Sequence, residues 1–335
     1  MTDYKDILPK VGFIAIGRNE GERLQIALKA IKQHYSDSPV VYVDSGSTDN
    51  SVEFAASIGV DVVELDMSIP FTAARARNAG FEQLLKQFSD LTYIQFLDGD
   101  CEVLSGWVEA GLQTLEDPKI GIASGRRAER YPDASIYNTL MDMEWNSPVG
   151  EIMGVPGDIL IEVELFKKLE GFNPALIAGE DFDLCLRAKE LGFITYRVDA
   201  PMSMHDANIM HFSQWYKRAK RGGHAWANLY HIHYHTAAHH FRRKIFGILF
   251  YALLLPFALI FFANVRPALA VVLIIGFLLM VSRSVVKRLL AGDAIKLALG
   301  YSALSYIAKF PELLGMYEYW KVILRKQRHT LIEYK

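Results

Sequence analysis

Short apolar runs alternate with amphipathic segments through the first hundred residues. Residues 11–16 and 40–43 are β-prone, and residues 20–33 between them carry apolar side chains at helical spacing, which predicts a βαβ unit. Further β-prone runs at 61–65 and 92–97 follow helical stretches. The pattern predicts an α/β domain in which helices flank a mostly parallel sheet and ligands bind where the strands end.

The hydropathy pattern changes after residue 240. Residues 245–263 are almost wholly apolar, which is about the length that crosses a bilayer as a helix. A second run, 268–282, follows a brief turn and is short enough either to span a thinned bilayer or to dip into it. Basic residues flank both ends of this hairpin, so the positive-inside rule predicts that the preceding domain faces the cytoplasm.

Residues 294–320 are apolar in parts but contain charged side chains and Pro311. This composition favours an interfacial helix with a break near Pro311, and a third transmembrane helix is the alternative. Its aromatic side chains suit the headgroup boundary of a bilayer. We therefore expect an α/β domain over residues 1–240 and a membrane-anchoring region over residues 241–335.

The composition narrows the class of protein. The 335 residues are 51% hydrophobic and 22% charged, which is enough for one large domain and an appendage. A net charge of −2 gives no electrostatic footprint for nucleic acid. The two cysteines, Cys101 and Cys185, lie far apart and do not predict a disulfide framework. The first ten residues contain no apolar run and do not resemble a secretory signal.

The strongest chemical signal is a hydrophobic strand that ends in Asp98-Gly99-Asp100. Two carboxylates at a strand end suit a hard divalent cation such as Mg²⁺ or Mn²⁺, which can bridge to a diphosphate. A glycine between them lets the backbone approach a ligand closely. The alternative is an ordinary Asp-Gly turn that closes the strand.

Two polar clusters follow the first two predicted strands, at 18–20 (Arg-Asn-Glu) and 44–49 (Asp-Ser-Gly-Ser-Thr-Asp). They would lie on the sheet edge where nucleotides bind. Asp44 can accept a hydrogen bond from a base, and the small residues around Gly46 leave room for a ribose. A segment at 71–80 adds cations that can face a diphosphate, with solvated surface charges as the alternative.

A further acidic pair, Glu180-Asp181, follows Gly179 and is expected to start a helix. One of its carboxylates can accept the proton of an attacking hydroxyl, which is the work of a general base. Acids in a first helical turn are also ordinary partners of the helix macrodipole, so that alternative stays open.

Together, and in this order, the motifs resemble those of the inverting family 2 glycosyltransferases with a GT-A fold, over residues 11 to about 230. The resemblance implies that Asp181 is the catalytic base, that Asp98, Asp100 and His205 hold Mn²⁺ or Mg²⁺, and that a nucleotide sugar is the donor. The implied donor-binding residues are Arg18, Glu20, Asp44, Ser45, Gly46, Arg77, Asn78, Asp98 and Gly99. For His205, a core or surface histidine is the alternative.

The acceptor side of the site is less distinctive. Residues expected to face the acceptor or the diphosphate are Trp145, Gly157, Asp158, Glu180, Arg218 and Arg221. Trp145 can stack on a sugar or pack in the core. Processive relatives carry a Gln-x-x-Arg-Trp motif that residues 217–226 lack, so we expect one sugar to be transferred per binding event.

We therefore expect a GT-A domain with a C-terminal transmembrane hairpin and an interfacial helix, at the cytoplasmic face of a bacterial inner membrane. The expected partners are a UDP-sugar, a lipid-linked or membrane acceptor and membrane lipids, without nucleic acid. A catalytically silent nucleotide-sugar-binding protein is the alternative. A nicotinamide-dependent oxidoreductase is set aside because no glycine-rich fingerprint follows the first strand.

Overall fold

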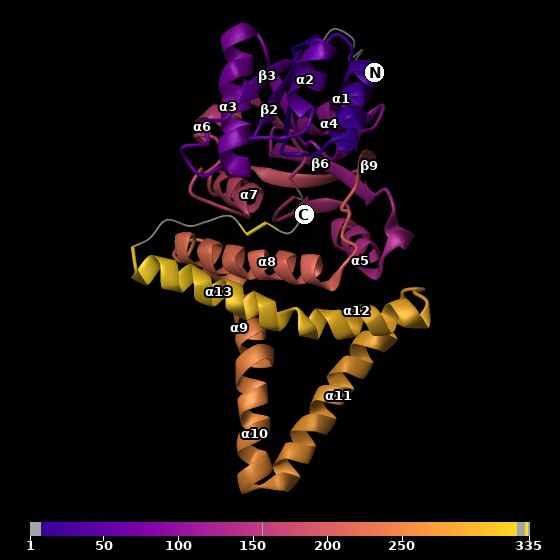
Figure 1. Cartoon of the computed structure of the whole chain (residues 1–335), viewed down its shortest axis with the longest axis vertical. Coiled ribbons are helices and arrows are strands. Elements are labelled where there is room, and N and C mark those ends of the chain that lie inside the picture. Colours follow the sequence, from indigo (N-terminus) through magenta and orange to yellow (C-terminus); the bar gives the residue numbers. More distant parts are fainter. Residues whose placement is uncertain (1–7, 156, 327–331, 334–335) are drawn as a thin grey trace. The chain divides into compact units, whose positions relative to one another are not determined.

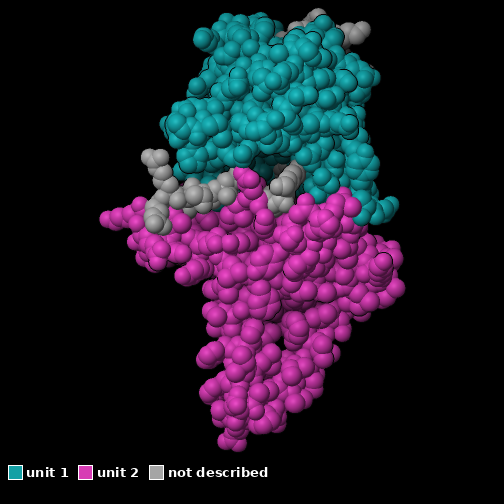
Figure 2. All heavy atoms as spheres, in the orientation of Figure 1, with its two compact units in different colours: residues 1–134, 141–208 teal, residues 135–140, 209–335 magenta. Residues whose placement is uncertain are grey.

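The computed structural model describes residues 8–155, 157–326 and 332–333 (Figure 1). The chain forms two compact units, one of residues 1–134 and 141–208 and the other of residues 135–140 and 209–335 (Figure 2). The division after Asn208 falls well before residue 240, because helix α8 (Phe212–Ile232) packs against the C-terminal helices.

Within the described residues, a nine-stranded sheet in the order β3-β2-β1-β4-β8-β6-β9-β5 forms the centre of the first unit, and β7 pairs with β9. The strands are β1 (Val11–Gly17), β2 (Val40–Asp44), β3 (Asp61–Glu64), β4 (Tyr93–Asp98), β5 (Cys101–Val103), β6 (Ile120–Glu129), β7 (Gly150–Ile152), β8 (Ile159–Glu162) and β9 (Ile194–His205).

The half of the sheet formed by β3, β2, β1 and β4 is parallel, as predicted. Its register places Asp98 beside Ile16 and Asp44 beside Gly17. The carboxyl ends of β1, β2 and β4 therefore meet at one edge, where open α/β sheets bind their ligands. In the other half, β8 runs antiparallel between β4 and β6.

Helices cover both faces of the sheet, which explains why β1, β2, β4 and β8 are apolar along most of their length. One core lies under α1, α2 and α4, and a second lies under α3, α6 and α7. These helices are α1 (Glu22–His34), α2 (Ser51–Ser57), α3 (Ala73–Gln87), α4 (Trp107–Leu115), α6 (Val163–Lys168) and α7 (Glu180–Glu190). Helix α5 (Ile136–Trp145) crosses the division between the units.

The second unit is helical. After α8 it contains α9 (Ala238–Leu249), a π-helical turn (Phe250–Leu254), α10 (Leu255–Val265), α11 (Pro267–Leu290), α12 (Ile295–Ile307) and α13 (Lys309–Leu324). The π-helical turn ends two residues before Pro256, whose missing N–H and bulky ring disturb the preceding helical hydrogen bonds.

Two of these helical stretches are long and apolar enough to cross a membrane, His239–Val265 and Pro267–Leu290. Only 17% and 6% of their most apolar windows are buried, unlike the core helix of a soluble protein. The second stretch has 24 residues, so it is longer than the run at 268–282 and long enough to span a bilayer of ordinary thickness. Helices α10 and α11 meet at the turn between them (Figure 1).

The segment predicted as an interfacial helix is two helices, α12 and α13. The break lies at Ala308, three residues before Pro311, as predicted, and Pro311 itself lies in the first turn of α13, where a proline is tolerated. The exposed side chains on these helices recur every three or four residues, and they are mainly Ile295, Leu299, Ala303, Ile307, Phe310, Leu314, Tyr317 and Leu324. We call this set the apolar stripe.

Helices α8 and α13 pack backbone to backbone through two glycines. A Cβ atom on Gly223 would lie 1.9 Å from the carbonyl oxygen of Glu312, and one on Gly315 would lie 1.9 Å from that of Lys220. The buried face of α13 includes Glu312, Gly315, Met316 and Tyr319, which lies opposite the apolar stripe at helical spacing.

We expect Gly223→Ala to destabilise the second unit by about 1–3 kcal/mol or more, because the new methyl group has no space. The adjacent Gly222→Ala is the matched control, since its Cβ would meet only Trp226 Nε1 at 3.9 Å. Alanine favours a helix interior by roughly 0.5–1 kcal/mol over glycine. The two variants should shift the thermal unfolding midpoint in detergent in opposite directions, and equal shifts would contradict the packing described.

Candidate active site

The turn between β4 and β5 carries the Asp98-Gly99-Asp100 motif to the edge of the sheet. The Gly99 N–H donates to the carbonyl of Ile16 at the end of β1, at 2.7 Å. A Cβ on Gly99 would lie 2.9 Å from that same oxygen and 3.4 Å from Cγ of Glu20. Glycine is therefore required here by close packing against β1, and Glu20 lies beside the motif.

Arg77 links two of the predicted acidic residues. Its guanidinium donates to Asp98 Oδ1 at 2.7 Å and to Glu180 Oε1 at 2.6 Å. Helix α3 lies tightly on the sheet because Gly80 packs against Ile14 and Val43, and Arg77, one turn earlier, lies on the same helix face. Arg77 is buried and therefore joins β4 to the start of α7.

A second buried arginine, Arg127 on β6, holds the other side of Asp98. It donates to Asp98 Oδ2 at 3.0 Å and to Asp158 at 2.6 and 3.0 Å. Burial opposes the charge on Asp98, but Arg77 and Arg127 together hold its pKa well below the usual range. Asp98 is ionised, and the 28% exposure of its side chain leaves acceptor positions open to a ligand.

Asp158 is fully buried, and its carboxylate also accepts from the Ser203 hydroxyl at 2.6 Å. Asp158 therefore positions Arg127, and its contact with the acceptor or the diphosphate stays a prediction. The neighbouring Gly157 has φ +95°, and a Cβ there would lie 3.2 Å from both Arg77 and Asp98, so it keeps a side chain out of this cluster.

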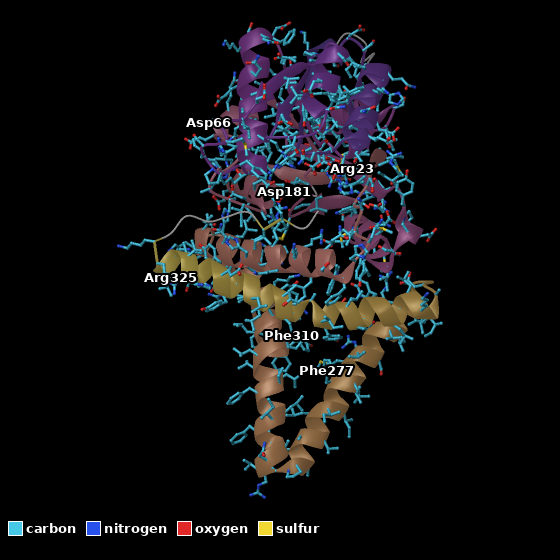
Figure 3. All side chains as sticks on the ribbon, in the orientation of Figure 1. Arg23, Asp66, Asp181, Phe277, Phe310 and Arg325 are labelled. Atoms are coloured by element: carbon cyan, nitrogen blue, oxygen red, sulfur yellow. The ribbon has the colours of Figure 1, made fainter. Side chains whose placement is uncertain are left out.

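Asp181 lies in the first turn of α7 (Figure 3) and accepts the N–H of Phe182 at 2.8 Å. Burial and the adjacent Glu180 raise the pKa of Asp181 to about 7, against the opposing effect of Arg77. Arg77 is already paired with Glu180 and Asp98. A carboxyl group poised near neutral pH is suited to general base catalysis.

Asp100 and His205 come together, as predicted, although they are far apart in sequence. Nε2 of His205 lies 3.3 Å from Oδ1 of Asp100, and Nδ1 lies 3.5 Å from Oε2 of Glu129. Burial lowers the pKa of His205 despite the adjacent Glu129, so its imidazole is neutral. A neutral imidazole and a carboxylate at this separation, with a carboxylate behind the second nitrogen, fit a divalent cation.

Trp145 packs beside this pair. Its ring lies 4.5 Å from the His205 ring and 5.5 Å from the Arg127 guanidinium. Trp145 is half-buried, so it belongs to the wall of the candidate site.

The loop after β2 is held by the carboxylate of Asp44, the last residue of that strand. Asp44 accepts hydrogen bonds from the Tyr42 and Ser47 hydroxyls and from the N–H groups of Gly46 and Ser47. These four donors use the acceptor positions that we expected a nucleotide base to occupy. Ser45 is buried.

Three other residues predicted to bind the donor contact the chain's own groups, and their donor contacts stay predictions. Both ends of the Asn78 amide bind the backbone of Phe172, at 2.7 and 2.9 Å. The Arg18 guanidinium lies 4.9 Å from the centre of the Phe71 ring. Gly46, with φ +81°, packs against Met67. Arg218 and Arg221 belong to α8 in the second unit, and their contact with a diphosphate stays a prediction.

Sequence reasoning missed Arg127 and Glu129. Both lie near the end of β6, where residues 126–129 alternate between partly buried and buried positions. Arg127 and Glu129 are two positions apart at the end of a strand, so they lie on the same face of the sheet. This spacing was the signal that the sequence offered.

Comparisons with known proteins show which family the chain resembles. The family described as glycosyl transferase family 2 matches residues 14–161, and the one described as glycosyl transferase family group 2 matches residues 93–282, more than half of the chain. The chain is 27% identical over 197 residues to glycosyltransferase AglE of Haloferax volcanii, covering 56% of this chain and 63% of that relative. It thus spans less than two thirds of the relative's length.

Among solved structures, the chain resembles mannosyltransferase PcManGT from Pyrobaculum calidifontis, determined in complex with GDP-Man and Mn²⁺. The TM-score is 0.51 at 19% identity, over 65% of this chain and 63% of that one. A second neighbour is S. aureus TarS 1–349 in complex with UDP-GlcNAc, with a TM-score of 0.46 at 12% identity, over 65% and 66% of the two chains. The predicted GT-A fold is confirmed, and the chain belongs to the family 2 glycosyltransferases.

Proposed function

We propose that the protein transfers one sugar from a nucleotide-sugar donor to a membrane-associated, lipid-linked acceptor, with inversion at the anomeric carbon. The observation that carries this proposal is the cluster in which Asp181, with a pKa of about 7, lies beside the network of Arg77, Asp98 and Glu180. A single carboxylate base acting once supports one displacement, and one displacement inverts the configuration.

In this mechanism the Asp181 carboxylate takes the proton of the acceptor hydroxyl as the hydroxyl oxygen attacks the anomeric carbon. The bond from that carbon to the diphosphate breaks as the new glycosidic bond forms. Asp98, fixed by two arginines, accepts a hydrogen bond from the donor ribose. Asp100 and His205 would hold Mn²⁺ or Mg²⁺, and the ion would supply positive charge against the departing diphosphate.

The second unit supports the membrane part of the proposal. The two apolar helical stretches are suited to a hairpin anchor. Phe310 of the apolar stripe lies on the hairpin side of α12 and α13 (Figure 3), and Tyr306, one turn earlier, packs on Tyr251 and Phe277. We propose that the stripe enters the interfacial layer, so the acceptor is drawn from the same membrane.

The experiment that tests the function is nucleoside diphosphate release by the detergent-solubilised protein. Donors are UDP-, GDP- and TDP-sugars with Mn²⁺ or Mg²⁺, with and without an extract of polyprenyl-linked acceptors. We expect one donor to give acceptor-stimulated release that EDTA abolishes and added Mn²⁺ restores. Donor binding without release from any donor, with intact acceptor present, would favour a silent binding protein.

The pH profile follows from the raised pKa of Asp181. A general base acts in its ionised form, so kcat/KM should be flat above pH about 7 and fall about tenfold per pH unit below it. The measurement uses saturating Mn²⁺ at every pH, because metal binding also depends on protonation. A rate that stays constant down to pH about 5 would contradict Asp181 as the base.

A further inference from the structure

A buried thiol faces the pair formed by Asp100 and His205. Cys101 is the first residue of β5, and in the antiparallel pairing of β5 with β9 its direct partner is His205. Directly opposed residues of an antiparallel pair project their side chains from the same face of the sheet. Cys101 and His205 therefore approach the Asp100 carboxylate from neighbouring strands.

The donor atoms of these three residues have the spacing of a metal site. Oδ1 of Asp100 lies 3.3 Å from Nε2 of His205 and 3.7 Å from Sγ of Cys101, and all three donor atoms lie within 4.8 Å of one another. A tetrahedral ion with bonds of about 2.0 Å to N and O and about 2.3 Å to S separates such ligands by roughly 3.3 and 3.5 Å. The Asp100–His205 separation equals the first value, and the Asp100–Cys101 separation exceeds the second by about 0.2 Å.

Divalent ions differ in how well they accept these three ligands. Mn²⁺ and Mg²⁺ favour oxygen ligands, whereas Zn²⁺ accepts thiolate, imidazole and carboxylate in one tetrahedral shell. We propose that Asp100, Cys101 and His205 form a three-ligand site for a thiophilic divalent ion such as Zn²⁺, and that such an ion competes with the Mn²⁺ or Mg²⁺ of the transfer reaction. Binding forms a metal–sulfur bond and releases the thiol proton to solvent.

A neighbouring set of donors is less suited to a cation. Asp98 and Asp158 also lie near Cys101, but both carboxylates are bound to the Arg127 guanidinium at 2.6 to 3.0 Å. Their charge is already compensated by a buried cation that would repel a metal. The site is therefore assigned to the side of Cys101 that faces Asp100 and His205.

The test titrates the purified protein with Cd²⁺, as a thiophilic probe, and records the ultraviolet charge-transfer absorbance of a metal–thiolate bond. The chain has two cysteines, and Cys185 is also buried and free, so Cys185→Ser leaves Cys101 as the sole thiol and is the matched control. We expect a band that saturates at one equivalent in the wild type and in Cys185→Ser, and no band in Cys101→Ser.

His205→Ala should weaken Cd²⁺ binding more than roughly tenfold. Losing a group that only supports a ligand costs about that much, and His205 is proposed to bind the ion directly. A missing band in folded Cys185→Ser, or a band that persists in Cys101→Ser, would overturn the proposal. Because Cys185→Ser retains all three ligands, the test stands even where Cys101→Ser fails to fold.

This inference deepens the metal site of the proposed function, but its main readout needs no sugar transfer. Absence of nucleoside diphosphate release would refute the transferase and leave the Cd²⁺ band unaffected. Where release is observed, Zn²⁺ should inhibit Mn²⁺-dependent release in the wild type and in Cys185→Ser, and equal inhibition of Cys101→Ser would count against thiol ligation.

Discussion

Asp181→Asn is expected to lower kcat for sugar transfer by about 10²–10⁴-fold, which is the usual contribution of a positioned general base. An amide has nearly the same shape as the carboxylate and can still accept the Phe182 N–H, but it cannot take a proton from the acceptor hydroxyl. Donor affinity should change little. The measurement determines kcat and the dissociation constant of the donor for the wild type and for Asp181→Asn, and compares each quantity between the two proteins.

The control for this prediction is Asp199→Asn, because Asp199 lies on β9 with a side chain that is 90% exposed. It should leave kcat unchanged. If Asp181→Asn retained more than about a tenth of the wild-type kcat, another group would have to serve as the base, since a tenfold loss is below the usual range.

Arg127→Leu is expected to cost about 3–5 kcal/mol of folding free energy, because it leaves Asp158 buried without its cation. It also removes one of the two arginines that hold Asp98. The loss should appear as a lower denaturation midpoint, together with weaker donor binding through the freed Asp98 side chain.

A second change separates charge from packing. In Arg127→Leu/Asp158→Asn the buried carboxylate is gone as well, so the double variant should recover part of the stability lost in Arg127→Leu. Lys189→Met is the control, since Lys189 pairs with Glu151 at the surface and its loss costs at most about 1 kcal/mol. A double variant less stable than Arg127→Leu would contradict the role given to Asp158.

The elements nearest the site were predictable because their signals are local. Strands β1 and β2 end where apolar runs give way to Gly17 and Asp44, and Glu180 begins α7 after Gly179. The approach of His205 to Asp100 was predicted only through the family resemblance. No spacing rule joins residues a hundred positions apart.

What the sequence does not reveal is which donors already satisfy a polar side chain. Asp44, Asn78 and Asp158 carry the atoms that a ligand needs, but in the structure the chain's own N–H, O–H and guanidinium groups occupy them. Arg127 was missed for the same reason. Arg127 binds Asp98 on β4 and Asp158 beside β8, and only folding brings these two residues close to it.

The glycine contact between α8 and α13 has a mechanical consequence. At Gly223 and Gly315 no side chain separates the two backbones, so this crossing has little that can adapt to a change of angle, since packed interiors yield little to strain. Helix α8 should therefore behave as a rigid arm fixed to α13. Any tilt imposed on the apolar stripe by a curved or thinned bilayer would be passed undiminished to the arginines that α8 carries.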